Sequence, residues 1–228
     1  MPATHKNEPV PDELIRARIE TTQPFAAYAE RSILVVPYFE HALYQLSDDE
    51  LTSEKILGLA RSAEKRILGV DVAARPLLAI PHLLNQESAA AYHGYLLANM
   101  AVYQTRAYFE STYGYLTDNP AIGPALANHY WAPGNRINHN ATLVNLTVEP
   151  FNPKYLADSC NNTSEQAWAE AQRLIAAAAQ RSYAEAPRAD LDATIRIVHG
   201  AELIADNSTS EVAMCVAFEH WVGKHYPS

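Results

Sequence analysis

A polar and aromatic stripe runs from His82 to Arg106, in a stretch that the sequence predicts to be mostly helical. A spacing of three or four residues places side chains on one flank of a helix. That spacing relates Tyr92, Tyr95, Asn99, Tyr103 and Arg106. Phenols and amides hydrogen-bond peptide carbonyls and stabilise negative charge that develops on a tetrahedral oxyanion. The stripe therefore predicts the wall of a peptide-binding cleft, with His93, Asn99, Tyr103 and Arg106 as candidate substrate-binding residues.

The same spacing has a second interpretation that needs no ligand. Long helices often carry tyrosines that are half buried, with the hydroxyl at the rim of the core. Small residues on the adjoining flank then allow close packing, and this flank contains Ala91, Gly94, Ala98 and Ala101. Spacing alone leaves both interpretations open.

Apolar residues at helical spacing predict the elements that precede the stripe. After a polar lead, residues 12–23 have a helical composition, and a core-facing stripe follows at Val35, Phe39, Ala42, Leu43 and Leu46. Ser47-Asp-Asp-Glu50 resembles a capping box in front of a second helix that ends at Gly69. One face of this helix carries Ile56, Leu57, Ala60, Ala63 and Ile67. We expect these two helices to pack against each other in antiparallel orientation.

The longest helix is expected from about Ser88 to Tyr115, after a loop at 71–86, and it carries the stripe. Shorter helices are expected at 121–130 and 136–146.

Behind these, Thr163-Ser-Glu-Gln166 resembles a capping box, and further helices are expected at 190–205 and after Ser208-Thr-Ser-Glu211. The last helix carries apolar residues that we expect to be buried: Val212, Cys215, Val216, Phe218, Trp221 and Val222. No alternating strand pattern is found, so the predicted class is all-α. The predicted organisation is a polar lead at 1–11, a cleft-wall segment at 12–158, and a helical extension at 159–228 packed on the same domain.

Composition narrows the classes of partner. The formal net charge is -9, with 17 Lys and Arg against 26 Asp and Glu, which argues against nucleic acid and anionic membrane surfaces as partners. The two cysteines, Cys160 and Cys215, are not in a C-x-x-C pair, and we expect both to be buried and reduced. The first residues lack the basic-then-apolar order of a secretory signal, and no apolar run has the length of a membrane span. We expect a cytoplasmic protein.

From about Pro37 to Leu156, several segments occur in an order that resembles a known family. They are Pro37-Tyr-Phe-Glu-His-Ala-Leu-Tyr44, Pro81-His82, Ala91-Tyr92-His93-Gly-Tyr95-Leu, Ala101-Val-Tyr-Gln-Thr-Arg106-Ala-Tyr-Phe109, Trp131-Ala-Pro-Gly-Asn135 and Leu146-Thr-Val-Glu-Pro150-Phe. The chain is similar there to the C-terminal part of the catalytic domain of the thimet oligopeptidase and oligoendopeptidase F family of zinc metallopeptidases.

The resemblance implies a multi-helix, cleft-wall half of a helical zinc metallopeptidase. In that family a wall histidine and a tyrosine cluster steady the substrate and the oxyanion. His82 resembles the wall histidine, and Tyr92 and Tyr95 resemble the last tyrosines of the cluster, so these three are the candidate catalytic residues. The family holds zinc with an H-E-x-x-H helix and a downstream glutamate, and H-E-x-x-H does not occur in this chain. We expect no metal ligands here, and zinc only if another chain or an upstream region supplies its ligands.

Three hypotheses remain open at this point. The chain is the C-terminal subunit or segment of a split zinc peptidase that is inactive in isolation. Alternatively, it is a catalytically inactive module that binds peptides or a partner protein, or a helical interaction domain without a ligand site. A surface that a complete peptidase buries is apolar and exposed in the isolated chain, so the first hypothesis implies a second protein chain or a homo-oligomer.

Overall fold

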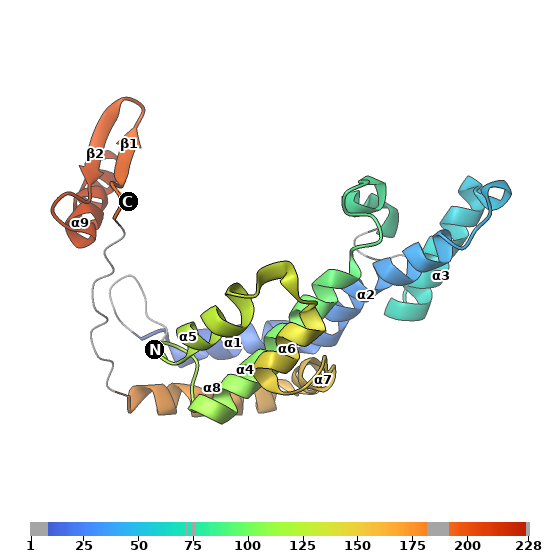
Figure 1. Ribbon diagram of the computed structural model, residues 1–228, viewed down its shortest axis with the longest axis horizontal. Helices are drawn as coiled ribbons and strands as arrows, with labels where there is room; N and C mark the ends of the chain where they lie inside the picture. The colour runs from blue at the N-terminus through green and yellow to red at the C-terminus, as the bar shows by residue number, and fades with distance from the viewer. Residues whose placement is uncertain (1–8, 72, 74–75, 182–191, 227–228) are drawn as a thin grey trace. The chain divides into compact units, whose positions relative to one another are not determined.

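The computed structural model describes residues 9–71, 73, 76–181 and 192–226 (Figure 1). The chain divides into two compact units, Met1–Arg181 and Ser182–Ser228, and each is described by itself. The boundary expected near residue 158 falls inside helix α7 (Lys154–Asn161). Most of the expected polar lead, residues 1–8, lies outside the described residues. The packing of residues 159–228 on the same domain stays a prediction.

The first unit is built from helices joined by short turns. Its α-helices are α1 (Asp12–Thr22), α2 (Ala26–Leu43), α3 (Ser53–Leu68), α4 (His93–Tyr113), α5 (Ile122–Leu126), α6 (His139–Thr147), α7 and α8 (Ser164–Ala179). Single turns of other helix types are η1 (Gln23–Phe25), η2 (Asp48–Glu50), η3 (Leu77–Ala79), η4 (Pro81–Leu84), η6 (Gly134–Arg136) and the π-helical turn η5 (Ala127–Trp131). The described residues are mostly helical, which confirms the predicted all-α class.

Capping residues set several of the helix boundaries. Ser47 and Glu50 form the predicted capping box at η2, and Thr163 and Gln166 form the one that opens α8. Helix α3 ends at Gly69, whose φ of 76° lies in the left-handed region that glycine adopts without steric cost. The two capping boxes and the end at Gly69 were predicted from the sequence and are confirmed, but α3 itself begins later than Ser47 implied, at Ser53, with Thr52 as its N-cap.

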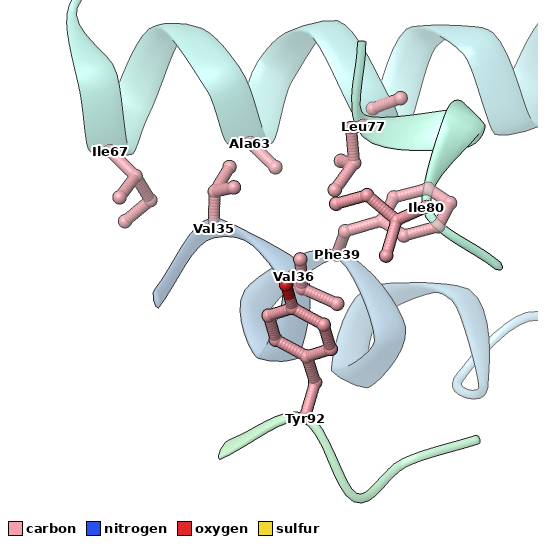
Figure 2. Close-up of a cluster of buried hydrophobic side chains, with 9 residues drawn as sticks. Val35, Val36, Phe39, Ala63, Ile67, Leu77, Ile80 and Tyr92 are labelled. Carbon is pink, nitrogen blue, oxygen red and sulfur yellow. The ribbon is translucent and has the colours of Figure 1, made fainter. Parts of the chain in front are cut away.

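The core of the first unit lies between α2 and α3 and is closed by the segment that follows α3. It contains Val35, Val36, Phe39, Ala60, Ala63, Ile67, Leu77, Ile80 and Tyr92 (Figure 2). The apolar stripes predicted on α2 and α3 therefore face each other. Leu57 was predicted on the same face, but its side chain is 45% exposed.

Two buried carboxyl groups hold the segment between α3 and α4 against this core. Glu40 on α2 accepts a hydrogen bond from the Ala90 backbone N–H at 2.8 Å, and Glu64 on α3 accepts one from the Leu77 N–H at 3.0 Å. Both side chains are buried. Ala90 has a φ of 59°, outside the helical region. The prediction that the long helix begins near Ser88 is therefore wrong, because the chain turns at Ala90 and α4 begins at His93.

A buried glutamine joins α4 to the turn between α6 and α7. The Gln104 side chain is 1% exposed, and its Oε1 accepts a hydrogen bond from the Asn152 backbone N–H at 3.0 Å. Its Nε2 donates to three oxygens: Thr147 Oγ1 at 3.1 Å, Glu149 O at 3.1 Å and Pro150 O at 3.0 Å. Both ends of the amide are thus satisfied inside the protein, which is what burial of a polar group requires.

The second unit contains a β-hairpin, which the sequence analysis missed. Strand β1 (Arg196–His199) pairs antiparallel with β2 (Glu202–Asp206), with Arg196 opposite Asp206 and His199 opposite Glu202. The helix predicted at 190–205 is therefore wrong from residue 192 onward, and residues 190 and 191 lie outside the described residues. Ile195, Ile197 and Val198 favour a strand, and Gly200, with a φ of 59°, fits the two-residue turn.

Helix α9 (Glu211–His225) follows the hairpin and packs on β2. Its N-cap is Ser210, whose Oγ accepts a hydrogen bond from the Ala213 N–H at 3.0 Å, so the cap lies two residues beyond the predicted Ser208. Met214 is buried, whereas Val212 and Val216 are more than half exposed and Cys215 is exposed. The expectation that this apolar set, Cys215 included, is buried is wrong, because a two-stranded hairpin covers only one side of the helix.

Replacing Gln104 by alanine removes the amide that joins α4 to this turn, and it leaves the Asn152 N–H and the Pro150 carbonyl without the partner that the amide supplies. We expect the free energy of unfolding to fall by about 2–4 kcal/mol, measured by urea denaturation. The matched control is Gln172→Ala on α8, where the side chain is exposed. A loss for Gln104→Ala no larger than that of the control would contradict the role of this side chain.

Candidate functional site

The three candidate catalytic residues come from the short turn η4 and from the start of the long helix α4. His82 lies in η4, Tyr92 is the N-cap residue of α4, and Tyr95 lies in the first turn of α4. The turn that reverses the chain between them is the one at Ala90, which Glu40 holds. Local sequence alone therefore does not bring His82 to the tyrosines, because a side chain from α2 fixes the turn.

The structure brings the three rings into mutual contact. The His82 Nε2 atom lies 3.0 Å from the Tyr95 hydroxyl oxygen, a hydrogen-bond distance. The His82 ring meets Tyr92 edge-on, with centroids 5.1 Å apart, and meets Tyr95 edge-on at 5.7 Å. The two tyrosine rings have centroids 4.9 Å apart. We call His82, Tyr92 and Tyr95 the ring cluster.

The two tyrosines of the ring cluster differ in exposure. Tyr92 is 9% exposed, and Figure 2 shows its ring extending from the backbone toward α2, within the core. Tyr95 is 50% exposed. Tyr95 is therefore the tyrosine that can meet a ligand, whereas Tyr92 packs beneath the other two rings.

The surroundings of His82 select one of its two neutral tautomers. Its Nδ1 atom is buried and has no hydrogen-bond partner among the described residues. A buried N–H without an acceptor is rarer than an unsatisfied acceptor, so we assign the ring hydrogen to Nε2. Nε2–H then donates to the Tyr95 oxygen, and the Tyr95 O–H remains free to donate to an acceptor outside the cluster.

The candidate substrate-binding residues do not gather around the ring cluster. His93 and Arg106 are exposed. Asn99 turns toward α2, where its Nδ2 donates to both carboxylate oxygens of Glu30, at 3.2 and 3.0 Å. Tyr103 lines a hollow further along α4. The stripe predicted as one surface is thus divided between the ring cluster and this hollow.

The hollow lies between the end of α1, the start of α2, α4 and α7, and has a volume of about 480 Å³. It is lined by Thr21, Thr22, Gln23, Phe25, Ala26, Ala29, Glu30, Tyr103, Ser159 and Cys160. We call it the Glu30 hollow. Gln23 ties its two sides together, because its Nε2 donates to the backbone oxygens of Ser159 at 2.9 Å and Asn162 at 3.0 Å.

Burial raises the pKa of the Cys160 thiol, and the negative charge of Glu30 raises it further. The thiol is partly buried, which departs from the fully buried position expected for it. Sequence reasoning missed Glu30 and Cys160 as site residues. Glu30 lies in a helix whose pattern pointed only to a core, and Cys160 lies beyond the segment that resembles the peptidase family.

The described residues do not form a zinc site. Among them, no group of three His, Cys, Asp or Glu side chains is placed to hold a metal ion. His199 and Glu202 are partners at the end of the hairpin. Helices of the described ranges also lack the combination of length and apolar character that a bilayer crossing requires.

Comparisons with known proteins found no relative of this chain. No family model matches the chain, and neither a curated protein nor a solved structure matches it.

The tautomer assignment is testable by NMR. For the neutral imidazole of His82 we expect the ¹⁵N shifts to show the hydrogen on Nε2 and none on Nδ1, because this tautomer avoids a buried N–H without an acceptor. Two-bond ¹H–¹⁵N correlation spectra of the histidine-labelled chain measure this, and a His82→Asn variant identifies the signals. The reverse tautomer would contradict the assignment and would direct the Tyr95 O–H toward His82.

The influence of Glu30 on Cys160 is testable by alkylation. Glu30→Gln removes a charge that raises the pKa of Cys160, so the thiolate fraction in mildly alkaline buffer increases. We expect iodoacetamide to react with Cys160 faster by on the order of twofold, a modest change because burial is the larger cause. Mass spectrometry measures the rate, with the exposed Cys215 as an internal reference. An unchanged or slower reaction at Cys160 would contradict this electrostatic effect.

Proposed function

We propose that the chain is the C-terminal subunit or segment of a zinc oligopeptidase-like protein. It supplies the histidine and tyrosine contacts to the substrate and the oxyanion, and the zinc ligands come from a partner chain or an upstream region. The observation that carries the proposal is the 3.0 Å contact between His82 Nε2 and the hydroxyl of the half-exposed Tyr95.

The contact supports a specific chemical task for Tyr95. With His82 donating to its oxygen, the Tyr95 hydroxyl hydrogen points away from the pair and is polarised by the bond that the oxygen accepts. A donor held in this way can bind a peptide carbonyl and bind it more strongly as negative charge develops on the oxygen. His82 acts through Tyr95 as a positioning residue, and Tyr92 holds both rings in place by packing.

Zinc does not fit the described residues, so no step through the metal is assigned to them. In this proposal the chain binds and orients the scissile carbonyl, and the activation of water belongs to the metal-bearing polypeptide. Apolar surface next to the ring cluster is consistent with a missing partner, because Leu84, two residues beyond His82, is 88% exposed.

The second candidate is a catalytically inactive peptide- or protein-binding helical module derived from the same family. One observation favours it over the split enzyme. Asn99 and Tyr103 are engaged by Glu30 and the Glu30 hollow, so two of the four predicted substrate contacts are directed away from the ring cluster.

The two candidates differ in the effect of Tyr95→Phe. The tagged full chain is purified from its source cells with its partners, and the complex is assayed for zinc and for cleavage of a fluorogenic peptide. In the split enzyme, Tyr95→Phe lowers kcat by about 10- to 100-fold with a smaller change in KM, because the donor acts mainly in the transition state. Tyr44→Phe is the control, since Tyr44 is an exposed tyrosine at the end of α2.

Three outcomes oppose the split-enzyme proposal. The first is a complex that contains neither zinc nor a partner with H-E-x-x-H. The second is an equal loss in kcat and in peptide affinity for Tyr95→Phe. The third is a stable monomer with which no other chain co-purifies. Peptide binding without cleavage in the complex supports the inactive module instead.

A further inference from the structure

Three polar side chains that line the Glu30 hollow use their hydrogen-bond donors within the chain. The hydroxyls of Thr21 and Thr22 donate to the backbone oxygens of Ala17 at 2.7 Å and Arg18 at 2.8 Å. The amide of Gln23 is likewise occupied, since it donates across the hollow to Ser159 and Asn162. These donors are already used, and what the threonines still offer to a ligand is the lone pairs of their oxygens.

The negative charge of the hollow also favours a ligand that donates hydrogen bonds. Glu30 receives hydrogen bonds from one amide, that of Asn99, although a carboxylate can accept about four. Among the described residues no lysine or arginine forms an ion pair with it; the ion pairs found there involve other carboxylates. A partly buried carboxylate with spare acceptor capacity attracts a cation that carries several N–H groups.

The walls also suit a cation on a short carbon chain. Phe25 and Tyr103 contribute aromatic rings, and Ala26 and Ala29 contribute methyl groups. Aromatic faces attract ammonium groups, and methyl groups accept the methylenes that follow. The effect of Glu30 on the pKa of Cys160 indicates that its field reaches the opposite wall, on α7. An anion would be repelled by this field.

We propose that the Glu30 hollow binds a primary ammonium group, with the Glu30 carboxylate as its ion partner and the Thr21 and Thr22 oxygens as further acceptors. The ammonium can belong to the amino end of a peptide or to a small amine, and the chemistry at Glu30 is the same for both. This site does not rest on the proposed peptidase function, because it uses none of the ring cluster and needs no metal-bearing partner.

The test is an NMR titration of the ¹⁵N-labelled full chain with n-butylammonium chloride. We expect saturable shifts at residues that line the hollow, and a loss of affinity of about tenfold or more in Glu30→Gln. Glu30→Gln keeps an oxygen that accepts from Asn99, so the fold is retained, and a thermal unfolding curve checks this. Glu13→Gln is the matched control, because it removes an equal charge from an exposed position on α1 that does not line the hollow.

Uncharged n-butanol and anionic butyrate test the charge preference, and neither is expected to produce these shifts. The proposal is overturned if n-butylammonium fails to bind the wild-type chain, if Glu30→Gln binds it equally well, or if n-butanol binds as tightly. Trialanine with a free amino end and its N-acetylated form then separate the sources. Tighter binding of free trialanine than of n-butylammonium, abolished by acetylation, identifies a peptide end; equal or weaker binding identifies a small amine.

Discussion

The arrangement of the first unit depends on two carboxyl groups that reach out of the paired helices α2 and α3 to the segment behind them. Glu64 fixes the start of that segment at Leu77, and Glu40 fixes its end at Ala90. Leaving a buried backbone N–H without a partner is costly, so these two bonds determine where the segment can lie. His82 sits between the two anchored points. The contact of its ring with Tyr95 follows from this anchoring, together with the packing of Tyr92 into the core.

The helical class and several helix ends could be predicted from the sequence because they depend on local signals. The spacing of Val35, Phe39, Ala63 and Ile67 places them on facing stripes, and Gly69 ends α3 by a conformation that few residues adopt. The start of α4 could not be predicted in this way. Residues 88–92 have a helical composition, and what stops the helix there is Glu40, which is about fifty positions away in the sequence. The hairpin after residue 192 was missed because its short strands lack clear alternation.

In the candidate site, too, the features that depend on local spacing could be predicted and those that depend on contacts between distant segments could not. The proximity of Tyr92 and Tyr95 follows from their spacing, whereas the approach of His82 depends on the turn at Ala90, which a side chain from α2 holds. The Glu30 hollow, in contrast, is made by side chains from four helices, and nothing in the spacing along α4 indicates that Asn99 faces Glu30. A stripe on a helix predicts a shared flank. It does not predict which neighbour each member of that flank will meet, because this depends on how the other helices cross it.

Gln104 has a consequence for the hollow that it does not touch. Gln104 is hydrogen-bonded to the turn that leads into α7, and Ser159 and Cys160 of α7 form one wall of the hollow. Tyr103, the residue before Gln104, belongs to another wall, on α4. The Gln104 amide therefore helps to fix the spacing between these two walls, together with the two bonds by which Gln23 holds α7. A ligand that fits the gap meets a preformed opening, and one that is too wide must first break a set of bonds in the interior.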